Sequence, residues 1–129
     1  MTTNSAIQKA CNDILIAANL GHPIAWPGIN FTPPSSGYWL VVTHLPNRGI
    51  DDRLANDSHV SPQGIYQVTV NSRPTSELNL REVAEQVQSV FPKGTAIAPP
   101  IRVTRHPYTT NAMYVDDHME LAVTIEYSE

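Results

Sequence analysis

The run Asp116-Asp117-His118 is the group of side chains in this sequence that most resembles a metal site. Carboxylate and imidazole groups bind divalent cations, and a bound cation would activate water for hydrolysis. Consecutive side chains point in different directions, however, whereas hard cations need several converging oxygen atoms. The other interpretation is a solvated turn that enters the last strand. A small metal-dependent hydrolase is therefore kept as an alternative function.

Nucleophilic or acid–base catalysis would need an activated thiol or a desolvated carboxylate. Cys11 is the single cysteine, and it falls on the apolar side of a predicted helix, where a small core residue is the commoner role. Asp51 and Asp52 are adjacent acids in a polar segment, where carboxylates are usually hydrated. The sequence offers no pocket that would desolvate either of them. We expect a protein that is not an enzyme, with no catalytic residue, no metal ligand and no cofactor.

Composition excludes further classes of function. The 129 residues carry 12 acidic and 8 basic side chains, a net charge of −4, and the basic residues form no cluster, which disfavours sequence-specific nucleic-acid binding. The six glycines are scattered and build no phosphate-binding loop. No apolar run approaches the roughly 20 residues of a membrane span, and no signal peptide is present. A single cysteine suits a reducing compartment. We expect a soluble protein made in a cytoplasm, with no membrane partner.

Hydrophobic periodicity predicts the elements that would position these side chains. A helix is expected over Ser5–Leu20, with Ser5 and Gln8 as a capping box. A second helix follows Ser76 and ends at Pro92-Lys93-Gly94. Alternation of period two or β-rich composition predicts four main strands, which are Tyr38–Leu45, Gly64–Asn71, Ile101–His106 and Met119–Tyr127, with Ile24–Pro27 and Met113–Val115 as short extended segments.

The order helix, strand, strand, helix, strand, strand predicts an α+β domain over residues 1–129. Two helices would pack on a mostly antiparallel sheet of four to five strands. The polar segment of about residues 46–63 has no sustained period and is expected to be a long loop between two paired strands. Tyr38–Leu45 is apolar on both faces, which indicates a strand packed from both sides or an interface. The nearby aromatic residues suit either the core or an oligomer contact; they are Trp26, Phe31, Tyr38 and Trp39.

Several runs, in this order, resemble the tail terminator, or tail completion, proteins of long-tailed bacteriophages. They are His22–Pro34, Tyr38–Val42, Gly64–Val70 and the helix end Phe91–Gly94, followed by a last strand like Leu121–Tyr127. The likeness covers nearly the whole chain. Its motifs are structural, so their combination carries the resemblance and no single motif does. The 46–63 and 107–117 segments depart from it, and no site is carried onto those positions.

The resemblance implies a virion protein that acts by assembly. Such a protein forms a ring with itself, usually a hexamer, which caps the tail tube, stops tube polymerisation and offers a surface to a head-completion or neck protein. The expected location is the head-proximal end of the tail in the virion, after assembly in the host cytoplasm. From the residues, we expect the subunit or tube interface to include the charged loop residues and one tryptophan; these are Arg48, Asp51, Asp52, Arg53 and Trp39. A head-to-tail neck adaptor is the alternative within the same virion.

Overall fold

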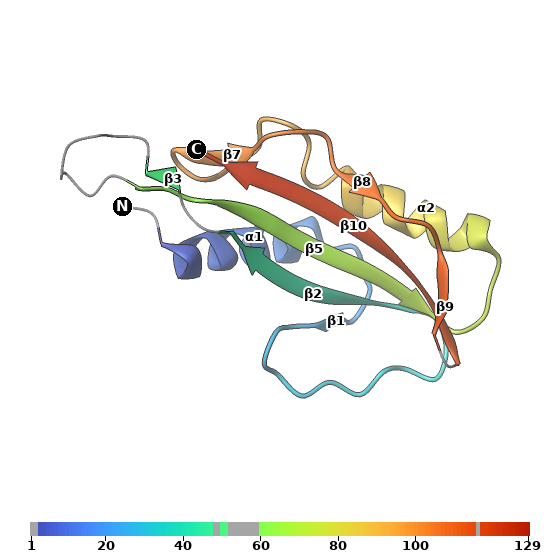
Figure 1. Cartoon of the computed structure of the whole chain (residues 1–129). Coiled ribbons are helices and arrows are strands. Elements are labelled where there is room, and N and C mark those ends of the chain that lie inside the picture. Colours follow the sequence, from blue (N-terminus) through green and yellow to red (C-terminus); the bar gives the residue numbers. More distant parts are fainter. Residues whose placement is uncertain (1–2, 48–49, 52–59, 116) are drawn as a thin grey trace.

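The computed structural model of the protein describes residues 3–47, 50–51, 60–115 and 117–129. Its helices and strands alternate along the chain as shown in Figure 1. In chain order they are α1 (Asn4–Ala18), β1 (Ile24–Ala25), β2 (Tyr38–Pro46), β3 (Ile50–Asp51), β4 (Val60–Ser61), β5 (Gln63–Ser72), α2 (Glu77–Gln88), β6 (Ala96–Ala98), β7 (Ile101–Val103), β8 (Tyr108–Thr109), β9 (Met113–Val115) and β10 (His118–Ser128).

The α+β class is as predicted, but the sheet is larger and less uniform than expected. Its strands run in the order β1-β2-β5-β10-β7-β6, and β8 and β9 also pair with β10, which makes an eight-stranded sheet. The predicted sheet of four to five strands is therefore too small. The sheet is mixed, because β1 pairs with β2 in parallel while the other ladders are antiparallel. Two- and three-residue strands such as β1 and β8 are too short to show a hydrophobic period.

Three long strands form the centre of the sheet. β2 pairs with β5 from Tyr38↔Ser72 to Pro46↔Gly64. β5 pairs with β10 over a longer register that ends at Gln63↔Ser128. The predicted antiparallel pairing of the strand after the second helix with the last strand is also confirmed, by β7 and β10. Side chains alternate between the two faces of each strand.

Helix α1 begins two residues earlier than the predicted capping box implies. Thr3 is the N-cap, because its hydroxyl oxygen accepts a hydrogen bond from the Ala6 amide at 3.1 Å. The helix buries Ile7, Cys11 and Leu15, spaced by four residues on one face. Ile7 and Cys11 belong to the helical stripe that the sequence predicts, which also includes Ala6 and Ala17, both exposed here.

Helix α2 matches its predicted pattern. Ser76 is the N-cap, and its hydroxyl oxygen accepts from the Asn79 amide at 3.1 Å. The buried side chains repeat at three- and four-residue steps, as an amphipathic helix requires. They are Leu80, Val83, Ala84 and Val87.

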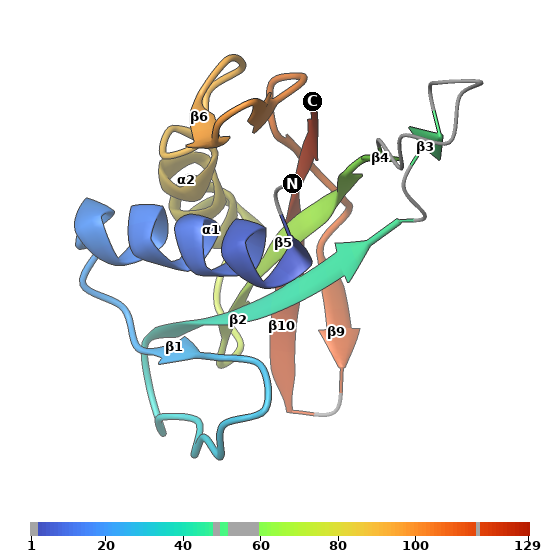
Figure 2. The same ribbon diagram turned by 90° about the vertical axis from the view of Figure 1, so that its left-hand side faces the viewer.

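Both helices lie on the same side of the sheet, as Figure 2 shows. The core fills the space between them and the inward side chains of the strands, among them Leu40, Tyr66, Val68 and Leu121. No helix among the described residues covers the opposite face of β2, β5 and β10, and Thr43, Gln67 and Thr69 on it are partly exposed. The prediction that β2 is packed from both sides by layers of the chain is therefore wrong, which leaves the interface interpretation open for its outer face.

The predicted long loop at about residues 46–63 contains regular structure. β3 and β4 pair antiparallel within it, through Ile50↔Ser61 and Asp51↔Val60. The amide of Asn47 donates to the carbonyl oxygen of Gln63 at 2.9 Å, which extends the β2–β5 ladder by one step. The segment that joins β2 to β5 thus contains a separate two-stranded sheet, formed by β3 and β4.

Candidate functional site

Trp39 is the predicted interface residue whose side chain the structure describes, and it is only 4% exposed. Arg73 Cζ lies 5.3 Å from the centre of its indole, and the His118 ring centre lies 5.7 Å away. Arg73 also donates to the Pro34 carbonyl oxygen at 3.2 Å and to the Asp117 carboxylate at 2.9 Å. These contacts cover Trp39 within its own chain. Its burial argues against the predicted role in a subunit contact, because little of the indole is left for a neighbour.

The charged loop residues of the predicted interface cannot be placed in the same way. Arg48, Asp52 and Arg53 lie outside the described residues, and of Asp51 the structure describes only the backbone, in β3. Their role in contacts between subunits or with a tube stays a prediction.

The residues of the supposed metal cluster make local ion pairs. Asp117 pairs with Arg73, and its Oδ1 lies 3.6 Å from His118 Nδ1. His118 Nε2 lies 3.5 Å from the carboxylate of Glu120. Asp116 lies outside the described residues. In the part of the chain that the structure describes, no group of three histidine, cysteine, aspartate or glutamate residues could hold a metal ion. The geometry lends no support to metal-assisted hydrolysis.

Cys11 is a core residue. It is fully buried in the face of α1 that packs on the sheet. Burial raises the pKa of its thiol to about 12, because the thiolate would lose its hydration. A thiol that stays protonated at neutral pH is a poor nucleophile, so Cys11 acts as a small apolar side chain.

A polar network that the sequence did not reveal ties α1 to the sheet. His44 Nδ1 lies 3.1 Å from Gln8 Oε1, which can only accept, so Nδ1 carries the proton. Tyr127 then donates its hydroxyl proton to His44 Nε2 at 2.7 Å. The hydroxyl of Tyr66 donates to Asn12 Oδ1 at 2.6 Å. Burial lowers the pKa of His44 and raises the pKa of Tyr127 to about 12, so both groups are neutral near pH 7. The network is structural, since its hydrogen bonds join side chains of α1 to side chains of β2, β5 and β10.

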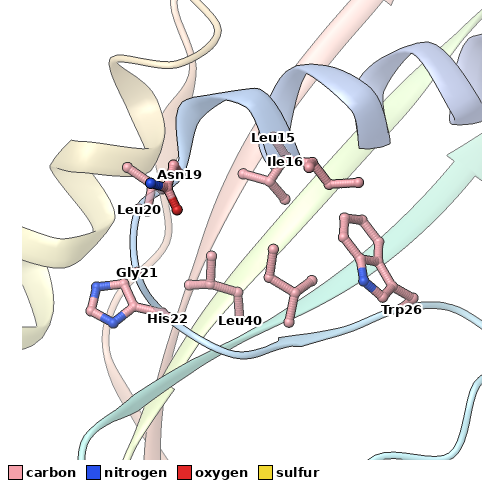
Figure 3. A pocket seen from close by; sticks show the side chains of 9 residues that line it. Leu15, Ile16, Asn19, Leu20, Gly21, His22, Trp26 and Leu40 are labelled. Carbon is pink, nitrogen blue, oxygen red and sulfur yellow. The ribbon is translucent and has the colours of Figure 1, made fainter.

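A groove lined by both apolar and polar side chains lies between the second half of α1 and the segment around β1 (Figure 3). Its main cavity measures about 330 Å³, and an adjoining hollow of about 400 Å³ continues along α1 toward its N-terminus. Ile16 and Trp26 line both parts. Figure 3 shows Leu15 and Ile16 pointing down from the helix, toward Leu40 and Trp26. We call this surface the α1–β1 groove, defined by Ile16, Leu20, Ile24, Trp26, Ile29 and Leu40.

Exposed apolar side chains also lie at the other edge of the sheet, on both of its faces: Tyr114 pairs with Met119, which belongs to the core, whereas Met113 and Tyr108 pair with Glu120 and Thr124 on the opposite face. Tyr108, Met113 and Tyr114, on β8 and β9, are 41%, 55% and 73% exposed. We call these three residues the β9 patch. In Figure 2, β1 lies to the left of the long strands and β9 to their right, so the α1–β1 groove and the exposed side chains of β8 and β9 belong to opposite parts of the sheet.

Sequence reasoning named Trp26 of the groove as a residue of the core or of an oligomer contact, but it missed the rest of both surfaces, although a signal for each was present. Ile16 is apolar but lies off the buried stripe of its helix, and an unexplained apolar residue on a polar helix face indicates a contact surface. Tyr114 stands in the middle of a short predicted strand with apolar neighbours on both sides. Neither signal shows which other segments lie beside it.

A sequence model of the phage tail terminator protein family matches residues 4–127. The chain belongs to this family. The match spans both helices and all the strands of the sheet except the last residue of β10, which confirms the resemblance seen in the sequence. No helix in the described part of this tail terminator family member is long and apolar enough to cross a membrane.

Solved structures share the fold of this tail terminator family member. One solved chain superposes with a TM-score of 0.78 at 21% identity, and the alignment covers 99% of this chain and 96% of that chain. A chain from the virion of a native gene transfer agent particle has a TM-score of 0.63 at 11% identity, with 96% and 94% covered. A search of curated proteins found no match. The family establishes a phage tail structural protein and a component of the virion, which points away from an enzyme.

Proposed function

We propose that this protein caps the phage tail tube as an oligomeric ring, stops tube polymerisation and presents the surface to which the head attaches. The observation that carries the proposal is the family match over residues 4–127. The described structure adds a physical argument, because the polar network around His44 ties α1 to the sheet and large apolar side chains such as Ile16 and Tyr114 are left exposed for contacts. Such a protein acts by shape and contact.

Termination follows from a ring with two different faces. One face must bind the last ring of tube subunits. The other face must differ from it, so that no further tube subunit can bind there. Head-to-tail contacts between copies close when each step turns by a fixed fraction of a circle, about a sixth for a hexamer. A ring placed at the head-proximal end of the tail would then leave one face to the head-completion or neck protein.

The charged loop is proposed to add polar contacts to a neighbouring copy or to the tube. Arg48 and Arg53 stand beside Asp51 and Asp52 in the sequence, and such mixed charges suit complementary surfaces. Replacing both arginines by alanine is expected to weaken assembly of the ring or its attachment to the tube. Unchanged assembly of the double variant would remove the loop from the proposal.

Net charge is compatible with a ring around the path of DNA. The subunit carries a net charge of −4, so on average its surface repels the phosphate backbone rather than holding it. A collar through which DNA passes needs such weak binding.

Electron microscopy of phage particles that lack this protein tests the proposal. Overlong tails without heads are expected, because tube growth would continue and the surface for the head would be absent. Tails of normal length beside separate filled or empty heads would contradict termination and favour a neck adaptor. Supplying the wild-type protein in the same cells is the control, and it should restore both tail length and joined particles.

A further inference from the structure

Residues 27–37, which connect β1 to β2, form an open segment that we call the strap. Figure 1 shows it leaving the sheet after β1 and returning to it at β2. Phe31 and Pro34 are partly buried, and the other residues of the strap are exposed. No apolar side chain of the strap, all of which the structure describes, belongs to the core or packs against it. Apolar packing on the core therefore does not fix the position of the strap.

One side chain from outside the strap contacts its backbone. Arg73, which follows β5, donates a hydrogen bond from Nε to the Pro34 carbonyl oxygen at 3.2 Å. The other hydrogen bond of the strap in the described structure is local, and joins the Ile29 amide to the Trp26 carbonyl oxygen at 3.2 Å. Between its two ends, the strap is thus joined to the described part of the sheet by hydrogen bonding through a single guanidinium group.

The same guanidinium group makes two further contacts. Its Nη1 donates to the carboxylate of Asp117, immediately before β10, at 2.9 Å. Its Cζ lies 5.3 Å from the centre of the Trp39 indole, on β2. Arginine can make such contacts together because the face of its planar group lies over an aromatic ring while the N–H groups at its edge donate. Lysine has one nitrogen atom and cannot replace this geometry.

The three contacts of Arg73 should differ in strength. The side chain of Asp117 is 80% exposed, so water and salt weaken its ion pair with Arg73. Trp39 is only 4% exposed, and a cation over a covered indole is bound more strongly than one over an exposed ring. A charged donor also strengthens the hydrogen bond to the Pro34 carbonyl oxygen. We therefore expect the indole and the carbonyl oxygen to hold Arg73, and the ion pair to add little.

We propose that Arg73 is a latch, which fixes the strap and covers Trp39 by binding the indole and the Pro34 carbonyl oxygen together. Because one side chain makes both contacts, the two effects are coupled. When Arg73 leaves, the strap loses its tether and the indole loses part of its cover. The opening is local, since the strap lies outside the core and outside the ladder of β2 with β5. The latch is a property of the single chain and does not depend on ring formation.

Heteronuclear NMR relaxation of the full chain tests the latch. In the wild type, the amides of Thr32, Ser35 and Ser36 should have the order parameters of rigid backbone, about 0.85. In Arg73→Ala they should fall below about 0.6, the range of flexible segments. Arg73→Lys keeps the charge but cannot bind both partners, so its values should lie between these two. The amide signals of β5 should keep their positions in both variants, which shows that the sheet persists.

A water-soluble paramagnetic agent measures the cover of Trp39 in the same samples. Broadening of the Trp39 ring signals should increase severalfold in Arg73→Ala, because the guanidinium no longer lies over the indole. Arg81→Ala is the matched control. Arg81 also makes an ion pair and a second hydrogen bond, to Glu77 and Thr109, both at 3.2 Å, but it lies on α2. This variant should leave the order of the strap and the cover of Trp39 as in the wild type.

Asp117→Asn separates the ion pair from the other two contacts. This variant should keep the strap ordered and Trp39 covered, since the exposed ion pair adds least. A strap as flexible in Asp117→Asn as in Arg73→Ala would overturn the assignment of the latch to the indole and the Pro34 carbonyl oxygen. A strap that is already flexible in the wild type, or that keeps its order in Arg73→Ala while the sheet persists, would overturn the latch itself.

Discussion

At the scale of single residues, Gly64 marks a place where three strands meet too closely for any side chain. It lies on β5, opposite Pro46 of β2 and Tyr127 of β10. A Cβ atom there would lie 2.6 Å from the Tyr127 hydroxyl, 2.8 Å from the Leu45 carbonyl oxygen and 2.9 Å from Pro46 Cα. Two of these three atoms belong to the backbone, which cannot swing aside as a side chain can.

Gly64→Ala is therefore expected to lower the free energy of unfolding by about 1–3 kcal/mol, the usual cost of overpacking. Urea denaturation of the wild type and the variant measures this difference. Tyr127→Phe added to the variant should recover part of the loss, because it removes the nearest atom. Gly28→Ala is the control for backbone conformation, since Gly28 has a φ of 76° and open space around it. A Gly64 variant as stable as the wild type would show that β2 moves away easily.

His44 gives the fold a dependence on pH. Burial lowers the pKa of His44 below its usual value of 6.5, so between these two values the unfolded chain binds the proton more readily than the folded chain. The free energy of unfolding should therefore be highest above about pH 6.5 and should fall as the pH is lowered below it. Urea denaturation at several pH values from about 7.5 to about 5 measures the decline.

His44→Gln is the control for this titration. The variant keeps a polar side chain but cannot bind the proton, so its stability should fall less steeply over the same pH range. The two proteins differ at position 44 alone, so a difference between their slopes belongs to His44. Equal slopes for the two proteins would show that His44 is not the group responsible.

At the scale of the elements, the caps decide where the helices begin. Ser76 satisfies the Asn79 amide at the start of α2. Ser76→Ala should lower the free energy of unfolding by about 1 kcal/mol, because this amide loses its acceptor, whereas Ser76→Asp should keep the stability. Thermal or urea denaturation distinguishes them. A Ser76→Ala variant that unfolds like the wild type would mean that water replaces the cap without cost.

The long elements could be predicted from the sequence because their signals are local. The alternation of Tyr66, Val68 and Val70 fixes a strand, and the three- and four-residue steps from Leu80 to Val87 fix a helix. The parallel pairing of Ile24 with Leu40 has no such signal, since two residues show no period and their partner lies elsewhere in the chain. The size of the sheet was underestimated for this reason.

At the scale of the whole molecule, the candidate site was predicted less well than the fold. Trp39 is apolar on an outward face and was a reasonable interface residue, but Arg73, from the end of another strand, covers it. The α1–β1 groove exists because Ile16 and Trp26, ten residues apart, are brought together by the turn after α1. Both facts depend on contacts between segments, which residue type and spacing do not specify.

Charged contacts and apolar contacts between subunits should respond differently to added salt. Ion pairs that involve Arg48 and Arg53 weaken as added salt screens them, whereas burial of apolar side chains between subunits does not. If apolar contacts dominate, the ring measured by sedimentation velocity should persist between about 50 mM and about 500 mM NaCl. The Debye length shrinks severalfold over this range of salt concentration. The Arg48→Ala, Arg53→Ala variant should then form rings of the same mass, and the loss should appear as weaker attachment of the ring to the tube. Rings that dissociate in high salt, and equally in this variant at low salt, would make the charged loop the main contact.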